Sequence, residues 1–109
     1  MLSALDLSSE DPHAIERRLD AEIPALILGG STHVVVSLGR RRDLPRSTVD
    51  AITLAHHEMR AVGGRLVVIA EPDVAAICAQ ACPGLLVAAT ERQAQAGLGL
   101  GDTPRAVAP

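Results

Sequence analysis

The chain has 109 residues, a formal net charge of -3 and no Phe, Trp or Tyr. Its 48% hydrophobic and 21% charged residues are typical of one globular domain rather than a disordered chain. The acidic balance and the lack of aromatic platforms argue against a nucleic-acid ligand, and no apolar run approaches the roughly 20 residues of a membrane span.

The first elements expected are a short strand over residues 1–7 and a helix that starts at Asp11 and Pro12. A glycine doublet at 29–30 should end this helix. Pro24 is expected to kink or split it, because proline removes a backbone donor and clashes one turn back. The apolar positions on the inward faces are Leu5, Leu7, Ile15, Leu19, Ile23, Leu26 and Ile27.

The middle of the chain predicts a strand, a loop, a helix and a second strand. Residues 33–38 contain three consecutive valines, which suits a strand covered on both faces. Residues 40–46 are predicted to be loop, and the next helix to begin at Ser47 and end at the glycine doublet 63–64. Another apolar strand covers 66–70. The inward positions of this helix are Val49, Ile52, Ala55, Met59 and Val62.

The last third predicts a helix that starts at Pro72, a short strand over 85–88 and a short final helix. Thr90 and Gln93 have the spacing of a capping box for that final helix. Residues 98–109 are expected to form a flexible tail.

Alternation of strands and helices predicts an α/β fold, with a mixed sheet of about four strands and helices packed on it. Residues 1–97 would form this domain. The N-terminus lacks the pattern of a signal peptide, so we expect a cytoplasmic protein.

No catalytic or nucleotide-binding fingerprint is present, so we expect a non-enzymatic protein without metal or cofactor. Cys78 and Cys82 lie at helical core spacing and cannot complete a four-ligand zinc site alone, so they are interpreted as small buried hydrophobes. His56 is expected to be a half-buried packing residue, and His57 to face water.

The segment VVVSLGRRRDLPRSTVDAITLAHHEMRAVGGRLVVI resembles the central part of the STAS domain, the fold of bacterial anti-sigma factor antagonists. That family has an apolar strand, a loop with Asp-Ser-Ser-Gly-Leu, a helix, Gly-Gly and another apolar strand. The downstream EPDVAAICAQACPGLLVAATERQAQAGL is similar to the helix, short strand and closing helix that follow in the family. The resemblance covers about residues 5–97 and implies a STAS-like sheet.

The phosphoacceptor motif of the family is altered. Its Asp-Ser-Ser-Gly aligns with Pro45, Arg46, Ser47 and Thr48, so the usual phosphoacceptor position is Arg46. Arginine cannot accept a phosphate, which implies binding without the usual serine switch. Ser47 fits a Ser-x-x-Asp helix cap, and we favour capping over the alternative that Ser47 or Thr48 accepts phosphate.

The loop and helix start at 40–48 are the predicted partner-binding surface. The resemblance implies an anti-sigma factor, a serine kinase of that class or another STAS protein as the partner. The family also begins with a strand pair where one strand is missing here, and an uncovered sheet edge would permit a homodimer. The candidate residues are Arg40, Arg41, Arg42, Asp43, Arg46, Ser47 and Thr48.

Three alternatives remain open. Some STAS domains are proposed to bind purine nucleotides, and the arginine-rich loop beside a helix start is a plausible site for GTP or ATP phosphates. Alternatively, the same arginines have no binding role and form only an ordinary charged surface loop. Other single-domain STAS proteins are subunits of transporter complexes, and this sequence does not distinguish that role from sigma-factor regulation.

Overall fold

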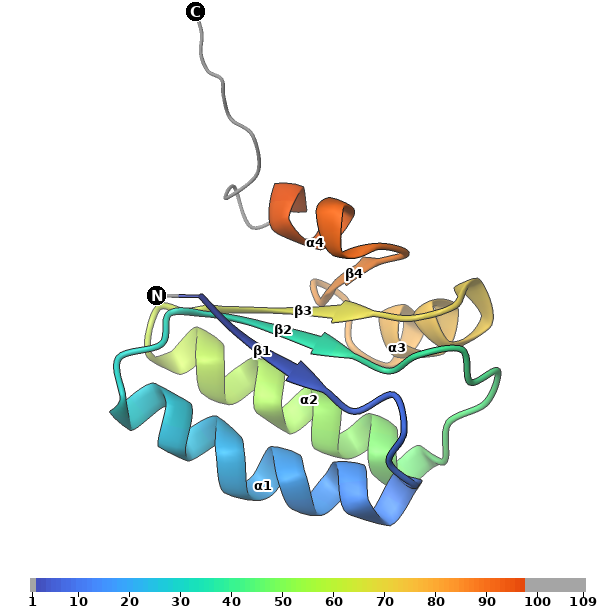
Figure 1. Ribbon diagram of the computed structural model, residues 1–109, viewed down its shortest axis with the longest axis horizontal. Coiled ribbons are helices and arrows are strands. Elements are labelled where there is room, and N and C mark those ends of the chain that lie inside the picture. The colour runs from blue at the N-terminus through green and yellow to red at the C-terminus, as the bar shows by residue number, and fades with distance from the viewer. Residues whose placement is uncertain (1, 98–109) are drawn as a thin grey trace, which may run out of the picture.

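The computed structural model describes residues 2–97 as four β-α units in succession (Figure 1). The predicted tail at 98–109 lies outside the described residues. The elements are β1 (Leu2–Asp6), α1 (Pro12–Leu28), β2 (His33–Ser37), α2 (Arg46–Ala61), β3 (Arg65–Ile69), α3 (Pro72–Ala81), β4 (Leu86–Ala88) and α4 (Glu91–Gly97). The predicted α/β fold with four strands is confirmed.

The sheet is parallel throughout, in the order β1-β2-β3-β4, so the prediction of a mixed sheet was wrong. Each strand in residues 2–97 is joined to the next by a helix, and such a crossover returns the chain in the same direction. An antiparallel strand would have needed a hairpin, which the described residues do not contain. The pairing of the two apolar strands on either side of α2 is confirmed, with Val35 opposite Val67.

The larger core lies between one face of the sheet and helices α1, α2 and α3 (Figure 1). Alternation along β2 directs Val34 and Val36 into this core and Val35 to the opposite face, where Val35 and Val67 pack with Ala94 of α4. β2 is therefore covered on both faces, as its valine run predicted. The helix contribution to the larger core includes Ile15, Leu19, Ile23, Val49, Ile52, Ala55 and Met59.

Two local predictions about the helices need correction. Pro24 does not split α1, which runs unbroken from Pro12 to Leu28. Burial of neighbouring residues such as Ile23 outweighs the single backbone bond that proline removes. Val62 is 54% exposed rather than inward, because α2 ends at Ala61 and helical periodicity no longer applies beyond it.

The predicted starts of α1 and α4 agree with the structure. Asp11 caps α1 by accepting a hydrogen bond from the Ala14 N–H at 2.8 Å. At the last helix, the Thr90 hydroxyl accepts from the Gln93 N–H at 3.1 Å, while Gln93 accepts from the N–H of Ala89 rather than of Thr90. The expected capping box is therefore present, except that the Gln93 side chain bonds to the N–H one residue before Thr90.

Candidate functional site

Arg41 ties the predicted loop to the carboxyl ends of β1 and β2. Its guanidinium donates to the carbonyl oxygens of Leu38 at 2.9 Å, Leu7 at 3.1 Å and Glu10 at 2.7 Å. Leu7 and Glu10 lie in the connection from β1 to α1, and Leu38 lies in the connection from β2 to α2. One side chain therefore holds the two connections together. Arg41 was predicted to bind a partner, and the structure places it as a clamp within the protein.

Gly39 lies in the same loop with a φ of +72°, in the left-handed region. A Cβ atom there would lie 2.6 Å from the Cβ of Ser8, far closer than two carbons can approach. The loop after β2 therefore passes directly over the turn after β1. Gly39 and Arg41 together fix the position of the chain that leads into α2.

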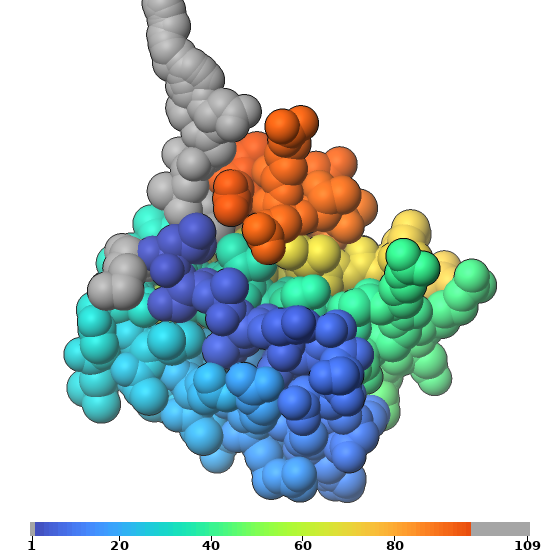
Figure 2. Space-filling model, viewed as in Figure 1, coloured from blue at the N-terminus to red at the C-terminus, as the bar shows by residue number. Residues whose placement is uncertain are grey.

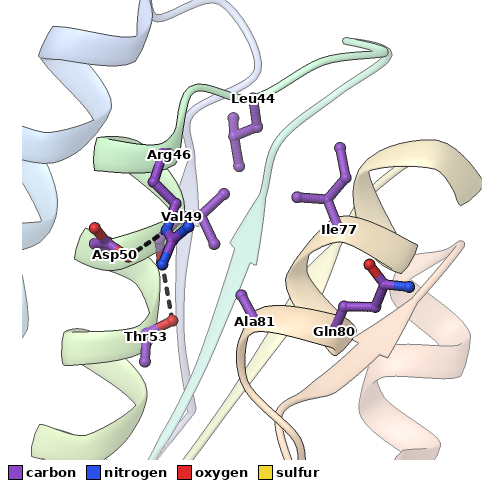
Figure 3. Close-up of a pocket in the computed structure, with 8 residues that line it drawn as sticks. All are labelled: Leu44, Arg46, Val49, Asp50, Thr53, Ile77, Gln80 and Ala81. Carbon is purple, nitrogen blue, oxygen red and sulfur yellow. Dashed lines mark hydrogen bonds and ion pairs between the residues drawn. The ribbon is translucent and has the colours of Figure 1, made fainter.

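A groove of about 570 Å³ separates the first half of α2 from α3 (Figure 3). Leu44, Val49 and Ile77 point into it, which gives it an apolar floor. The residues that line it are Leu44, Arg46, Val49, Asp50, Thr53, Ile77, Gln80 and Ala81. The α3 residues of this groove were not among the site residues predicted from the sequence. Their helical spacing, which leaves Ile77 half-buried, was the one available signal.

Arg46 stands at the rim of this α2–α3 groove with 87% of its side chain exposed. Its Nε contacts the Asp50 carboxylate at 3.3 Å, one helical turn on. An ion pair this exposed contributes little to folding. The cation is thus available to an acidic group that approaches the groove.

Ser47 and Thr48 both donate their hydroxyls to Oε2 of Glu16 in α1, each at 2.8 Å. These two hydrogen bonds, from Thr48 and then Ser47, lower the pKa of Glu16. The predicted capping role of Ser47 is wrong, because α2 begins at Arg46 with Pro45 at the cap position. The sequence analysis did not identify Glu16. Ser47 and Thr48 lie 31 and 32 positions from it along the chain, and no local pattern links positions so far apart.

A second cavity of about 570 Å³ lies on the other side of the α2 start, against the first turns of α1. It is lined by residues of both charges, among them Glu16 and Arg17. Arg40, Arg42 and Asp43 are exposed on the connecting loop, and the Asp43 carboxylate accepts from the Leu44 N–H at 2.8 Å. The predicted residues therefore surround the start of α2, with Thr48 buried and Arg41 occupied by carbonyls.

We expect no phosphorylation at Ser47 or Thr48 in the folded protein. Thr48 is fully buried, and a phosphate on Ser47 would stand beside the Glu16 carboxylate. Incubation with a serine kinase of the anti-sigma factor class and ATP should leave the intact mass unchanged, as measured by mass spectrometry. A gain of one phosphoryl group mapped to either residue would contradict this expectation.

His56 is more buried than predicted, with 6% of its surface exposed, and its Nδ1 has no hydrogen-bond partner among residues 2–97. Burial lowers its pKa, and the neighbouring His57 and Arg60 lower it further. The folded protein therefore favours neutral His56, while the unfolded chain takes up the proton near the ordinary value of 6.5. It follows that stability falls as the pH drops below that value.

The variant His56→Leu should remove this part of the pH dependence. One site can change the free energy of unfolding by at most about 1.4 kcal/mol per pH unit, so the variant should show a flatter profile between neutral and mildly acidic pH. Urea unfolding at several pH values measures it. A profile in His56→Leu as steep as in the wild type would show that other groups are responsible.

Cys78 and Cys82 are free and buried, as predicted, and burial raises the pKa of the Cys78 thiol. Residues 2–97 hold no cluster of His, Cys, Asp and Glu suited to a metal ion. Among the same residues, no helix has both the length and the apolar character needed to cross a bilayer. Comparison with protein-family models, with curated proteins and with solved structures gives no match.

Proposed function

We propose that this protein is a non-enzymatic interaction module that binds another protein through the start of α2 and the α2–α3 groove. The observation that carries the proposal is the position of Arg46. An exposed cation stands at the rim of a concave surface whose floor is apolar. Arginine beside an apolar pocket is a recurrent centre of protein–protein binding energy.

The chemistry of the surface indicates the partner's contact. Leu44, Val49 and Ile77 would accept an apolar side chain, and Arg46 would accept an Asp or Glu next to it. Because Asp50 already contacts Arg46 in an exposed pair, a partner carboxylate can replace that contact at small cost. An acidic, amphipathic segment of a protein fits both features.

The STAS resemblance supports an anti-sigma factor of the serine kinase class, or another STAS protein, as the source of that segment. The α/β layer of the structure is compatible with such a fold. With Arg46 at the phosphoacceptor position and Thr48 buried, binding would not be switched by phosphorylation there. A transporter complex remains the alternative assembly, and genes for a permease and an ATPase beside this one would favour it.

The nucleotide alternative has less support. Arg41 is committed to carbonyl oxygens, which leaves fewer cations for a phosphate. The strand order of residues 2–97 has no reversal, and ligands of open parallel sheets bind where the order reverses. Calorimetric titration with GTP and ATP should give no heat, and saturable binding would revive this alternative.

Charge reversal at the rim tests the proposed surface. Arg46→Glu should weaken binding to a purified kinase of the anti-sigma class by about 10-fold or more, through loss of the cation and repulsion of the partner's acid. The matched control is Arg92→Glu, which makes the same change at an exposed position in α4, across the sheet. Calorimetry measures both affinities, and equal affinities for the two variants would contradict the proposal.

A further inference from the structure

The outer edge of β1 carries backbone groups without a strand partner in the described part of the chain. The Leu7 N–H donates to the Ser37 carbonyl at 2.9 Å, so the backbone N–H of Leu7 points toward β2. Because the backbone groups of successive residues alternate between the two sides of a strand, the N–H and C=O groups of Ser3 and Leu5 also point toward β2. The N–H and C=O groups of Leu2, Ala4 and Asp6 therefore point outward.

This edge has few of the features that usually prevent pairing with another chain, and Asp6 at its end is the one charged residue of β1. β1 has no lysine, proline or bulge and keeps continuous register with β2 over Leu2–Asp6. Leu2 is 40% exposed and Ala4 is exposed. In Figure 2 the dark blue atoms of β1 lie open on the visible surface. Arg18 reaches the Asp6 carbonyl only at a long 3.4 Å and is held by Glu22 at 2.6 Å.

We propose that a second copy of the chain pairs with this edge, β1 against β1, antiparallel about a twofold axis at Ala4. The outward residues are spaced symmetrically about Ala4. In this register Leu2 lies opposite Asp6 of the second copy, and Ala4 opposite Ala4, so every outward group has a partner. The two sheets would join into one continuous sheet across the dimer.

Other registers satisfy fewer groups. A twofold axis at Asp6 would place two carboxylates opposite each other, which is destabilising, and would leave Leu2 unpaired. An axis at Leu2 would leave Asp6 without a partner in the described strand. The small side chain of Ala4 permits close approach at the axis. This inference does not depend on the proposed function, because β1 and the α3-contacting β4 are opposite edges of the sheet.

Sedimentation equilibrium of the full chain tests the dimer. The wild type should sediment at twice the 11.3 kDa of one chain. Ala4→Pro removes an outward N–H without touching the bonds to β2, and should weaken association by about 10-fold or more. Ala4→Val keeps the N–H and should remain dimeric. A monomeric wild type, or equal association of the two variants with intact circular dichroism spectra, would overturn the proposal.

Disulfide cross-linking tests the register. Residues directly opposite in a hydrogen-bonded antiparallel pair have Cα atoms about 5.5 Å apart, within reach of a disulfide. Ala4→Cys should therefore give a covalent dimer under mild oxidation, while Leu2→Cys, whose copies would lie about 14 Å apart, should not. The native thiols of Cys78 and Cys82 are buried and should not interfere. Equally fast cross-linking of the two variants would overturn the register.

Discussion

Gly39→Ala is expected to lower the free energy of unfolding by about 3 kcal/mol. Two effects combine. The left-handed backbone at φ +72° disfavours any residue with a Cβ, and the new methyl would collide with Ser8, 2.6 Å away. Either the loop or the turn after β1 must move, and the loop carries the chain into α2. Urea unfolding followed by circular dichroism measures the change.

Gly63 provides a matched control for the collision. Its φ of +76° is nearly the same, but a Cβ there would meet nothing within 4 Å. Gly63→Ala should therefore cost only the backbone strain, about 1 kcal/mol. If both variants lose the same stability, the close approach of Gly39 to Ser8 does not contribute.

Arg41→Ala is expected to destabilise the protein by about 2 kcal/mol and to weaken binding of the partner as well. The side chain donates to carbonyls of Leu7, Glu10 and Leu38, and hydrogen bonds from a charged donor are stronger than neutral ones. Without it, the loop loses its attachment to the turn after β1. Denaturant unfolding gives the stability, and the same kinase titration gives the affinity.

The adjacent Arg42 is the control for charge. It is exposed, and Arg42→Ala removes the same net charge without removing the clamp. Its stability should stay within about 0.5 kcal/mol of the wild type. A loss in Arg42→Ala as large as in Arg41→Ala would mean that overall charge, not the carbonyl contacts, stabilises the loop.

The elements of this fold could be predicted from local patterns. Unbroken valines marked β2, helical spacing marked α2, and glycine doublets marked where helices end. The direction of β1 was predicted wrongly, because the mixed sheet was inferred from the alternation of strands and helices without following each helical connection back to the same end of the sheet. Strand direction depends on those connections, and each of them is a helix between residues 2 and 97.

The sequence predicted where the candidate site lies, but not the contacts that each of its residues makes. The sequence indicated that the loop and the start of α2 belong together, but it could not separate Arg41 from its arginine neighbours. That distinction depends on carbonyls of residues more than 30 positions away, which only tertiary contact provides. The same is true of Glu16 and of the α3 side of the groove.

Site-specific photo-cross-linking in the native cell tests the proposed binding surface most directly. A photoreactive residue at Gln80, at the exposed rim of the α2–α3 groove, should form a covalent adduct with a protein partner. The same residue at Arg92 in α4 should not. Adducts at Arg92 with none at Gln80, or none at either position, would contradict the assignment of this groove as the binding surface.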